Sequence, residues 1–185
     1  MPKLSRFATL AICSVLWLAS APADASLAQD YPLQVGFEMT FSTAPGEQLQ
    51  LLYAPALNVA YAITNQMSVG LNRLTFGTIA LAAGERSHFG LTPYVERSRF
   101  IAYKTQLFGQ FGAAWQTRSG ANLPGSTGFA LSVAGGVRRW LAPHFSIGGV
   151  ARVLDVLSTG WAMNPRILPS GAIVMSLGFM LEGHF

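Results

Sequence analysis

Apolar and polar residues alternate with a period of two along much of this chain. From Leu33 to Ser42 the odd positions are all apolar and the even positions are all glycine or polar. The last segment repeats the pattern, because Leu177, Phe179 and Leu181 share one face and Glu182 lies on the other. Successive side chains of a β-strand point to opposite faces. Both segments are therefore predicted to be strands with one apolar and one polar face.

Six further segments of the same kind lie between these two strands. They are predicted at about 57–64, 67–76, 89–96, 100–117, 129–138 and from 145 onward. The apolar side switches parity after Asn72, and this predicts a bulge near Asn72 and Arg73. The connections alternate between short ones, at 64–66, 96–99 and 139–144, and longer ones, at about 43–55, 77–88, 118–127 and 155–170. This rhythm is typical of an up-and-down antiparallel barrel of eight strands.

The first residues have the layout of a secretory signal peptide. Lys3 and Arg6 precede an apolar run over 7–18, and the small-residue pattern at 23–25 follows. The run is shorter than the ~20 residues that a spanning helix needs. We therefore expect residues 1–25 to be a cleaved signal peptide and residues 26–185 to form one exported domain. Cys13, the only cysteine, would be removed with the leader.

The composition narrows the class of protein further. Of the 185 residues, 51% are hydrophobic and 11% charged, with 12 Lys+Arg against 8 Asp+Glu. A soluble domain has roughly 25% charged residues. So few charges, with no basic run, exclude a disordered chain, a coiled coil and a nucleic-acid binder. A soluble lipocalin-like carrier, with its apolar face inside, stays open as an alternative.

Three features favour an apolar face that points outward to lipid. The polar faces carry small residues and isolated charges, which suit a crowded lumen, and the apolar face is too continuous for one ligand pocket. Aromatic residues also gather near the predicted strand ends, as in the girdles of membrane barrels. Near the long loops these are Phe41, Phe76, Trp115 and Phe129, and near the short turns they are Tyr61, Phe100, Tyr103, Trp140, Phe145 and Phe185. In hydrocarbon, only a closed barrel satisfies every backbone group of a strand protein.

The parity of each strand then places the isolated charges in the lumen. The inward-pointing residues are predicted to be Glu38, Lys104, Arg138, Arg152 and Glu182. Buried charges must be paired, so we expect two clusters stacked along the barrel axis. One would hold Glu38, Arg152 and Lys104 at mid-barrel, and the other Arg138 and Glu182 near the end with short turns. The clusters are interpreted as a structural plug, with a gate or ion path as the functional alternative.

Candidate chemistry beyond these charges is sparse. The three histidines share no spacing for a metal site, and the glycines form no phosphate loop. His144 and Ser146 share a strand face, which resembles outer-membrane lipid A deacylases, with Glu182 as the nearest carboxylate that could orient the histidine. We expect no catalytic, cofactor or metal site, and keep a lipid esterase only as an alternative.

Two segments carry a resemblance to a known family. GVRRWLAPHFSIGGVARVL, at 136–154, resembles a turn between two barrel strands, and the chain ends in GAIVMSLGFMLEGHF. The chain resembles the small outer-membrane β-barrel proteins of Gram-negative bacteria, typified by the OmpA transmembrane domain and OmpX. The resemblance implies that the 136–154 turn is periplasmic and that the closing strand is read by the outer-membrane insertion machinery. The implied signal comprises Leu177, Phe179, Leu181 and Phe185, although Gly183 stands where the family usually has an aromatic.

The sequence as a whole predicts an all-β, eight-stranded antiparallel transmembrane barrel in the cell outer membrane. Its expected role is structural or surface-interacting and non-enzymatic, with a lumen plugged by polar side chains. The expected contacts are outer-membrane lipid, lipopolysaccharide and the insertion machinery, with no nucleic acid and no cofactor. A narrow pore, or a barrel that passes small apolar molecules sideways into the membrane, is the main alternative.

Overall fold

A computed structural model of the chain describes residues 31–43, 50–81, 84–120, 123–163, 166–168 and 170–185. The strands that form the barrel are β1 (Leu33–Thr43), β2 (Gln50–Ala62), β3 (Met67–Leu81), β4 (Gly84–Ala102), β5 (Thr105–Gly120), β6 (Leu123–Ala142), β7 (Phe145–Val156) and β10 (Ile173–His184). Two short strands, β8 (Trp161–Met163) and β9 (Arg166–Leu168), form a separate hairpin. Within these residues, no helix combines the length and the hydropathy needed to cross a membrane. The proposed signal peptide, residues 1–25, lies outside the described part of the chain.

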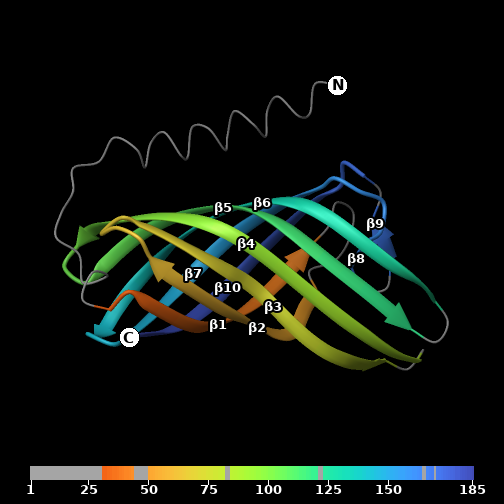
Figure 1. Ribbon diagram of the computed structural model, residues 1–185, viewed down its shortest axis with the longest axis horizontal. Helices are drawn as coiled ribbons and strands as arrows, with labels where there is room; N and C mark the ends of the chain where they lie inside the picture. The colour runs from red at the N-terminus through yellow and green to blue at the C-terminus, as the bar shows by residue number, and fades with distance from the viewer. Residues whose placement is uncertain (1–30, 44–49, 82–83, 121–122, 164–165, 169) are drawn as a thin grey trace.

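The barrel is closed by pairing of its first and last strands. Every neighbouring pair is antiparallel, and β1 lies between β2 and β10 (Figure 1). The register joins Gln34 to His184 at one end of the closing pair and Thr43 to Met175 at the other. The predicted eight-stranded antiparallel barrel is confirmed. The predicted bulge is confirmed as well, because the β3–β4 register shifts between Asn72 and Thr75.

Short turns and both ends of the barrel sequence meet at one end, on the left of Figure 1. We call this the turn end. The backbone N–H of Leu33 donates to the carbonyl of Phe185, and the turns after β2, β4 and β6 lie at the same end. The opposite end, where the strands β3 to β6 run far beyond the others, is called the loop end.

Two predicted long loops are wrong, as is one predicted turn. Residues 77–88 and 118–127 belong mostly to the paired strands β3 to β6, which are joined at the loop end around 82–83 and 121–122. Neither segment carries a clear alternation of apolar and polar residues, so neither shows the sequence pattern of a strand. Residues 96–99, predicted as a short turn, lie inside β4, which continues to Ala102.

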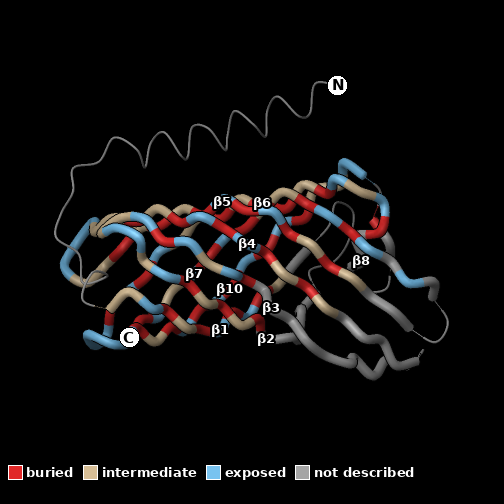
Figure 2. The backbone as a smooth tube through the Cα atoms, in the orientation of Figure 1, coloured by how far each residue is buried: buried red, intermediate tan, exposed pale blue. Residues whose placement is uncertain are grey.

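The two faces of the barrel wall differ sharply in polarity, and buried and exposed residues alternate along the strands (Figure 2). Phe37 is 56% exposed and Leu177 is 63% exposed on the outer face, whereas Glu38 and Arg152 are 1% and 2% exposed. The apolar side chains therefore point outward and the charged ones inward, as the alternation predicts. Burial in the lumen excludes the lipocalin-like arrangement, in which these charges would lie outside.

Small residues on the inner face give the lumen side chains their space. A Cβ atom added to Gly136 would collide with the carbonyl oxygen of Gly149 and lie 2.6 Å from Cζ of Phe108, its partner on the neighbouring strand β5. Such an approach is closer than van der Waals contact allows, so only glycine fits at this position. Its neighbour Gly135 points outward, where an added Cβ would meet only the carbonyl oxygen of Phe108, at 3.6 Å. The glycines on the polar faces are thus explained by packing inside the barrel.

Most of the described aromatic residues follow the predicted girdles, but Phe100 pairs with the lumen residue Gln106 and therefore has inward parity. The side chain of Phe76, another predicted girdle residue, lies outside the described part of the chain. Tyr61, Tyr103 and Phe185 lie exposed on the outer face toward the turn end. Trp140, which was predicted to lie in the same girdle, is only 2% exposed and points into the lumen. It shares its parity with the lumen residue Arg138, and the register shift of β6 falls only after Trp140. The girdle prediction is therefore wrong at this residue.

Candidate functional site

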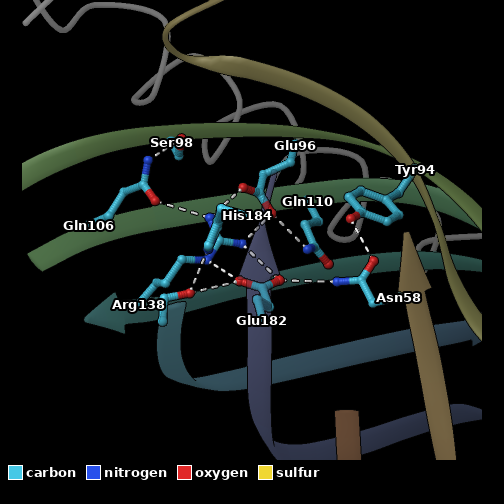
Figure 3. A network of polar contacts seen from close by, with 10 residues as sticks. Asn58, Tyr94, Glu96, Ser98, Gln106, Gln110, Arg138, Glu182 and His184 are labelled. Carbon is cyan, nitrogen blue, oxygen red and sulfur yellow. Dashed lines mark hydrogen bonds and ion pairs between the residues drawn. The ribbon is translucent and has the colours of Figure 1, made fainter. Parts of the chain in front are cut away.

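The lumen near the turn end is built around one arginine, shown in Figure 3. Nη1 of Arg138 donates to Oε1 of Glu96 at 3.0 Å, and Nη2 donates to Oε2 of Glu96 at 3.3 Å and to Oε1 of Glu182 at 3.2 Å. Nε of Arg138 forms an ion pair with Oε2 of Glu182. The guanidinium thus bridges two carboxylates from β4 and β10, and all three side chains are at most 2% exposed. We call this group the turn-end cluster.

Neutral side chains fill the remaining hydrogen-bonding positions of the turn-end cluster. Asn58 of β2 donates to Glu182 at 3.2 Å and accepts a 2.8 Å hydrogen bond from the hydroxyl of Tyr94. Gln106 accepts from Arg138 at 3.0 Å and donates to Ser98 at 2.8 Å. These bonds matter because a buried charge without partners costs several kcal/mol. The cluster joins β2, β4, β5, β6 and β10 across the lumen.

A second ion pair lies further along the axis. Arg152 of β7 donates to both carboxylate oxygens of Glu38, at 2.6 Å and 3.0 Å, and Asn72 of β3 donates to the same carboxylate at 2.9 Å. Gln110 connects the two levels, since it donates to Glu96 at 2.9 Å and accepts from Arg152 at 3.3 Å. We call this pair and its partners the mid-barrel cluster. The lumen therefore holds one continuous polar network.

Apolar side chains also lie inside the barrel, in two buried groups. Phe108, Ala134, Val150 and Met180 pack together in the lumen, and the ring of Phe108 lies 4.9 Å from the guanidinium carbon of Arg138. A second buried group comprises Ala114, Ala130, Leu154, Val156, Leu168 and Val174. Leu168 belongs to β9, so the β8–β9 hairpin contributes to this group. Polar and apolar groups of buried side chains thus both lie inside the barrel wall.

A serine and a histidine meet at the turn end, but not the pair that the sequence suggested. His144 is exposed in the β6–β7 turn, where its Nδ1 lies 3.1 Å from the carbonyl oxygen of His184. Ser146 instead contacts Nε2 of His184 at 2.9 Å and donates to Glu182 at 3.4 Å. Ser146 and His184 are both 0% exposed, and His184 stacks on Trp140 at 3.9 Å.

This arrangement does not match a serine hydrolase. In such a triad the histidine lies between the serine and the carboxylate, and the serine must reach a substrate. Here Glu182 contacts Ser146 directly, and Ser146 is fully buried. Among the described residues, no group of three or more His, Cys, Asp and Glu is placed to hold a metal ion. The lumen residues are therefore suited to filling and cross-linking the barrel.

Of the five charges expected in the lumen, four lie there, and these are Glu38, Arg138, Arg152 and Glu182. Lys104 does not, and its assignment to the mid-barrel cluster is wrong. It occupies the β4–β5 turn with φ at 59°, a left-handed conformation that takes it out of the strand alternation. Its Nζ lies 5.4 Å from the ring of Tyr103.

Sequence reasoning missed Glu96, which is as central to the network as Glu182. The signal was present, because Thr92, Tyr94, Glu96 and Ser98 share one parity and are all buried. Arg97 and Arg99 on the other parity made the segment look like a polar turn. The closing strand carries Leu177, Phe179, Leu181 and Phe185 exposed on the outer face of β10 and at its end. Their role as an assembly signal stays a prediction.

This chain is similar to known proteins in its fold but not in its sequence. No protein-family model matches the sequence, and neither does any curated protein. Solved structures do match the fold. They include Neisserial surface protein A, at TM-score 0.56 and 10% identity over 84% of this chain and 97% of that one. Ail, the attachment invasion locus protein of Yersinia pestis, matches at TM-score 0.51 and 14% identity, over 83% and 97% of the two chains.

A third similar structure is the N-terminal β-barrel domain of Pseudomonas aeruginosa OprF. It matches at TM-score 0.50 and 10% identity, over 80% of this chain and 96% of that domain. Identities this low relate architecture rather than activity. The coverage of 96–97% of each small barrel, together with the closed eight-stranded wall and its apolar exterior, leads to one conclusion. This chain has the fold of the small outer-membrane β-barrels.

Proposed function

We propose that this protein is an integral outer-membrane barrel with a closed lumen and a structural or surface-interacting role. The observation that carries the proposal is the position of Arg138, whose guanidinium binds Glu96 from one side of the lumen and Glu182 from the other. An ion path would need a row of solvated side chains, whereas these three are at most 2% exposed. The lumen is thus a packed core, and the parts of the protein that interact with other molecules are the barrel surface and the loop end.

The orientation follows from the two ends of the barrel. Outer-membrane barrels have short turns on the periplasmic side and longer connections outside. The turn end would therefore face the periplasm, and the extended strands β3 to β6 would project from the cell. The outer face would contact phospholipid and lipopolysaccharide, and the C-terminal strand would be recognised by the insertion machinery. The loop end is the place where a partner would bind.

Planar-bilayer recordings test the closed lumen. The folded protein should give no regular single-channel steps, because the turn-end and mid-barrel clusters fill the cross-section. A gel shift between unboiled and boiled samples, as folded outer-membrane barrels usually show, confirms that the protein tested is folded. Reproducible steps of uniform size from a heat-modifiable preparation would contradict the proposal.

One structural observation favours a second candidate function, lateral passage of small apolar molecules. Among the described residues, the β2–β3 register runs from Ala62–Ser68 only as far as Leu57–Leu74. Beyond that point β2 pairs with β1, and β3 pairs with β4. Pro55 lies just past the last pair and has no N–H to donate, so it suits a strand edge. The wall of the barrel is therefore weakest here.

Uptake of an apolar fluorescent probe tests this second candidate. Cells that make the protein should take up the probe faster than cells without it. A disulfide between Leu57→Cys and Leu74→Cys, at the last paired position, should slow the uptake, and reduction should restore it. The same uptake rate with and without the protein would exclude lateral passage and leave the closed-barrel proposal intact.

A further inference from the structure

Basic residues gather on the outer face of the barrel at the turn end. Arg97 and Arg99 occupy outward positions of β4, and Arg139 an outward position of β6. Lys104 lies in the turn after β4. We call these four residues the basic rim. None of them is among the buried lumen residues: Arg139 is exposed, and Arg97, Arg99 and Lys104 are half-buried.

The strand register brings the basic rim together. Only β5 separates β4 from β6, and Leu107 of β5 pairs with Arg99 on one side and with Val137 on the other. Arg139 lies two residues beyond Val137 and pairs with Thr105. Neighbouring strands are about 4.8 Å apart, so the two arginines are separated by roughly two strand spacings. Their long side chains can reach one phosphodiester group between them.

Two of these arginines contact residues in or beside the turns at the turn end. Nη2 of Arg97 donates to Oε1 of Gln66, in the β2–β3 turn, at 3.2 Å. Nη1 of Arg139 donates to Oγ1 of Thr105, at the start of β5, at 3.0 Å. This is the behaviour of arginines that extend from an apolar surface to a membrane interface.

Apolar side chains surround the same positions. Ile101 and Leu141 are each 51% exposed, and Tyr103 is 85% exposed. A soluble anion would gain nothing from these residues, whereas a lipid offers an acyl chain to them and a phosphate to the cations. The acidic side chains that the structure describes lie elsewhere, three of them in the lumen and Asp155 near the loop end of β7. Four basic side chains within one short stretch of the outer face and its turn are complementary to an anionic headgroup.

We propose that the basic rim binds the headgroups of anionic phospholipids in the periplasmic leaflet. This inference rests on the membrane-spanning barrel proposed above. The arginines and Lys104 would hold the phosphate, and Ile101, Tyr103 and Leu141 would contact the upper part of the acyl chains. Such a site selects lipids by charge and anchors the barrel at a fixed depth.

Spin-labelled lipids measure this selectivity directly. The protein is reconstituted in vesicles of phosphatidylcholine with phosphatidylglycerol, and the association of each labelled lipid is compared. Labelled phosphatidylglycerol should associate about fivefold more strongly than labelled phosphatidylcholine, the order expected for one basic residue near a membrane surface. The R97Q/R99Q/R139Q variant should bring the ratio close to one, and R97K/R99K/R139K should keep it. Raising the salt to about 1 M should also lower the ratio, because screening then acts within roughly 3 Å.

A matched variant separates the rim from overall charge. R86Q/R118Q/R166Q removes the same charge from segments toward the loop end and should leave the ratio unchanged. The proposal is overturned if this variant abolishes the preference, if R97Q/R99Q/R139Q keeps it, or if added lipopolysaccharide displaces phosphatidylglycerol from the rim. The gel shift between unboiled and boiled samples, called heat modifiability, is recorded for every variant. A heat-modifiable protein without lipid preference disproves only this site, whereas a protein that never inserts disproves the membrane barrel.

Discussion

Replacing Arg138 with leucine should lower the free energy of unfolding by about 3–5 kcal/mol, the range expected when one partner of a buried ion pair is removed. The change leaves Glu96 and Glu182 facing each other in a sealed lumen without the guanidinium that both of them bind. The two buried carboxylates then repel each other, and each loses the hydrogen bonds that it accepted from the guanidinium. Denaturant unfolding in phosphatidylcholine vesicles measures the difference.

Two further variants isolate the electrostatic cause of this loss. Arg139→Leu changes the next residue, which points outward and is exposed, and should cost no more than about 0.5 kcal/mol. The triple variant E96Q/R138L/E182Q should be clearly more stable than R138L alone, because its lumen carries no unpaired charge at this level. Equal losses for R138L and R139L would show that the turn-end cluster does not stabilise the barrel.

Placing arginine at Leu177 should cost about 2–4 kcal/mol, the range for a cation at the lipid-facing midplane of a barrel. Leu177 is 63% exposed, and its outward position would leave a charged group in hydrocarbon if the barrel spans a membrane. In a soluble protein the same substitution would cost almost nothing, because water would solvate the charge. Unfolding in vesicles, compared with wild type, gives the difference.

Leu141 provides the matched position for this test. It is outward and 51% exposed, but it lies next to the β6–β7 turn, where an arginine reaches the interface. Leu141→Arg should therefore cost only about 0–1 kcal/mol. If both substitutions had the same effect, the outer face would not be in contact with a hydrocarbon layer of limited thickness.

The alternation of the sequence was sufficient to predict the barrel because it reflects a single physical requirement. Each strand has an apolar face on the outside of the barrel and a polar face in the lumen, so Phe37 and Glu38 are adjacent but point in opposite directions. Where that requirement ends, the prediction fails. The extensions of β3 to β6 at the loop end carry no clear alternation, and residues 77–88 and 118–127 were assigned to loops.

The lumen residues could be predicted on strands whose ends are clear in the sequence, because counting alternate positions from such an end assigns each side chain to the inner or the outer face. Glu38, Arg152 and Glu182 lie on strands whose limits are clear, and each of them lies in the lumen. Lys104 lies in the β4–β5 turn and Glu96 in the strand before it, and the sequence does not reveal where that turn is. Arg97 and Arg99 occupy outward positions of β4, so in the sequence this face of the strand does not look apolar. Trp140 was misassigned because tryptophan is common in girdles, although its parity pointed inward.

The closing pair of strands determines the order in which this protein can fold. Gln34 and His184 are paired although 150 residues separate them (184 − 34), and Glu38 reaches Arg152 only when that wall is complete. Joining such distant segments carries a large loop-closure entropy, which slows folding. Until β10 is present, the edge of β1 that faces away from β2 has no partner. Closure of the barrel must therefore follow the synthesis of β10, and a chain truncated before β10 would leave one edge of its first strand open to aggregation.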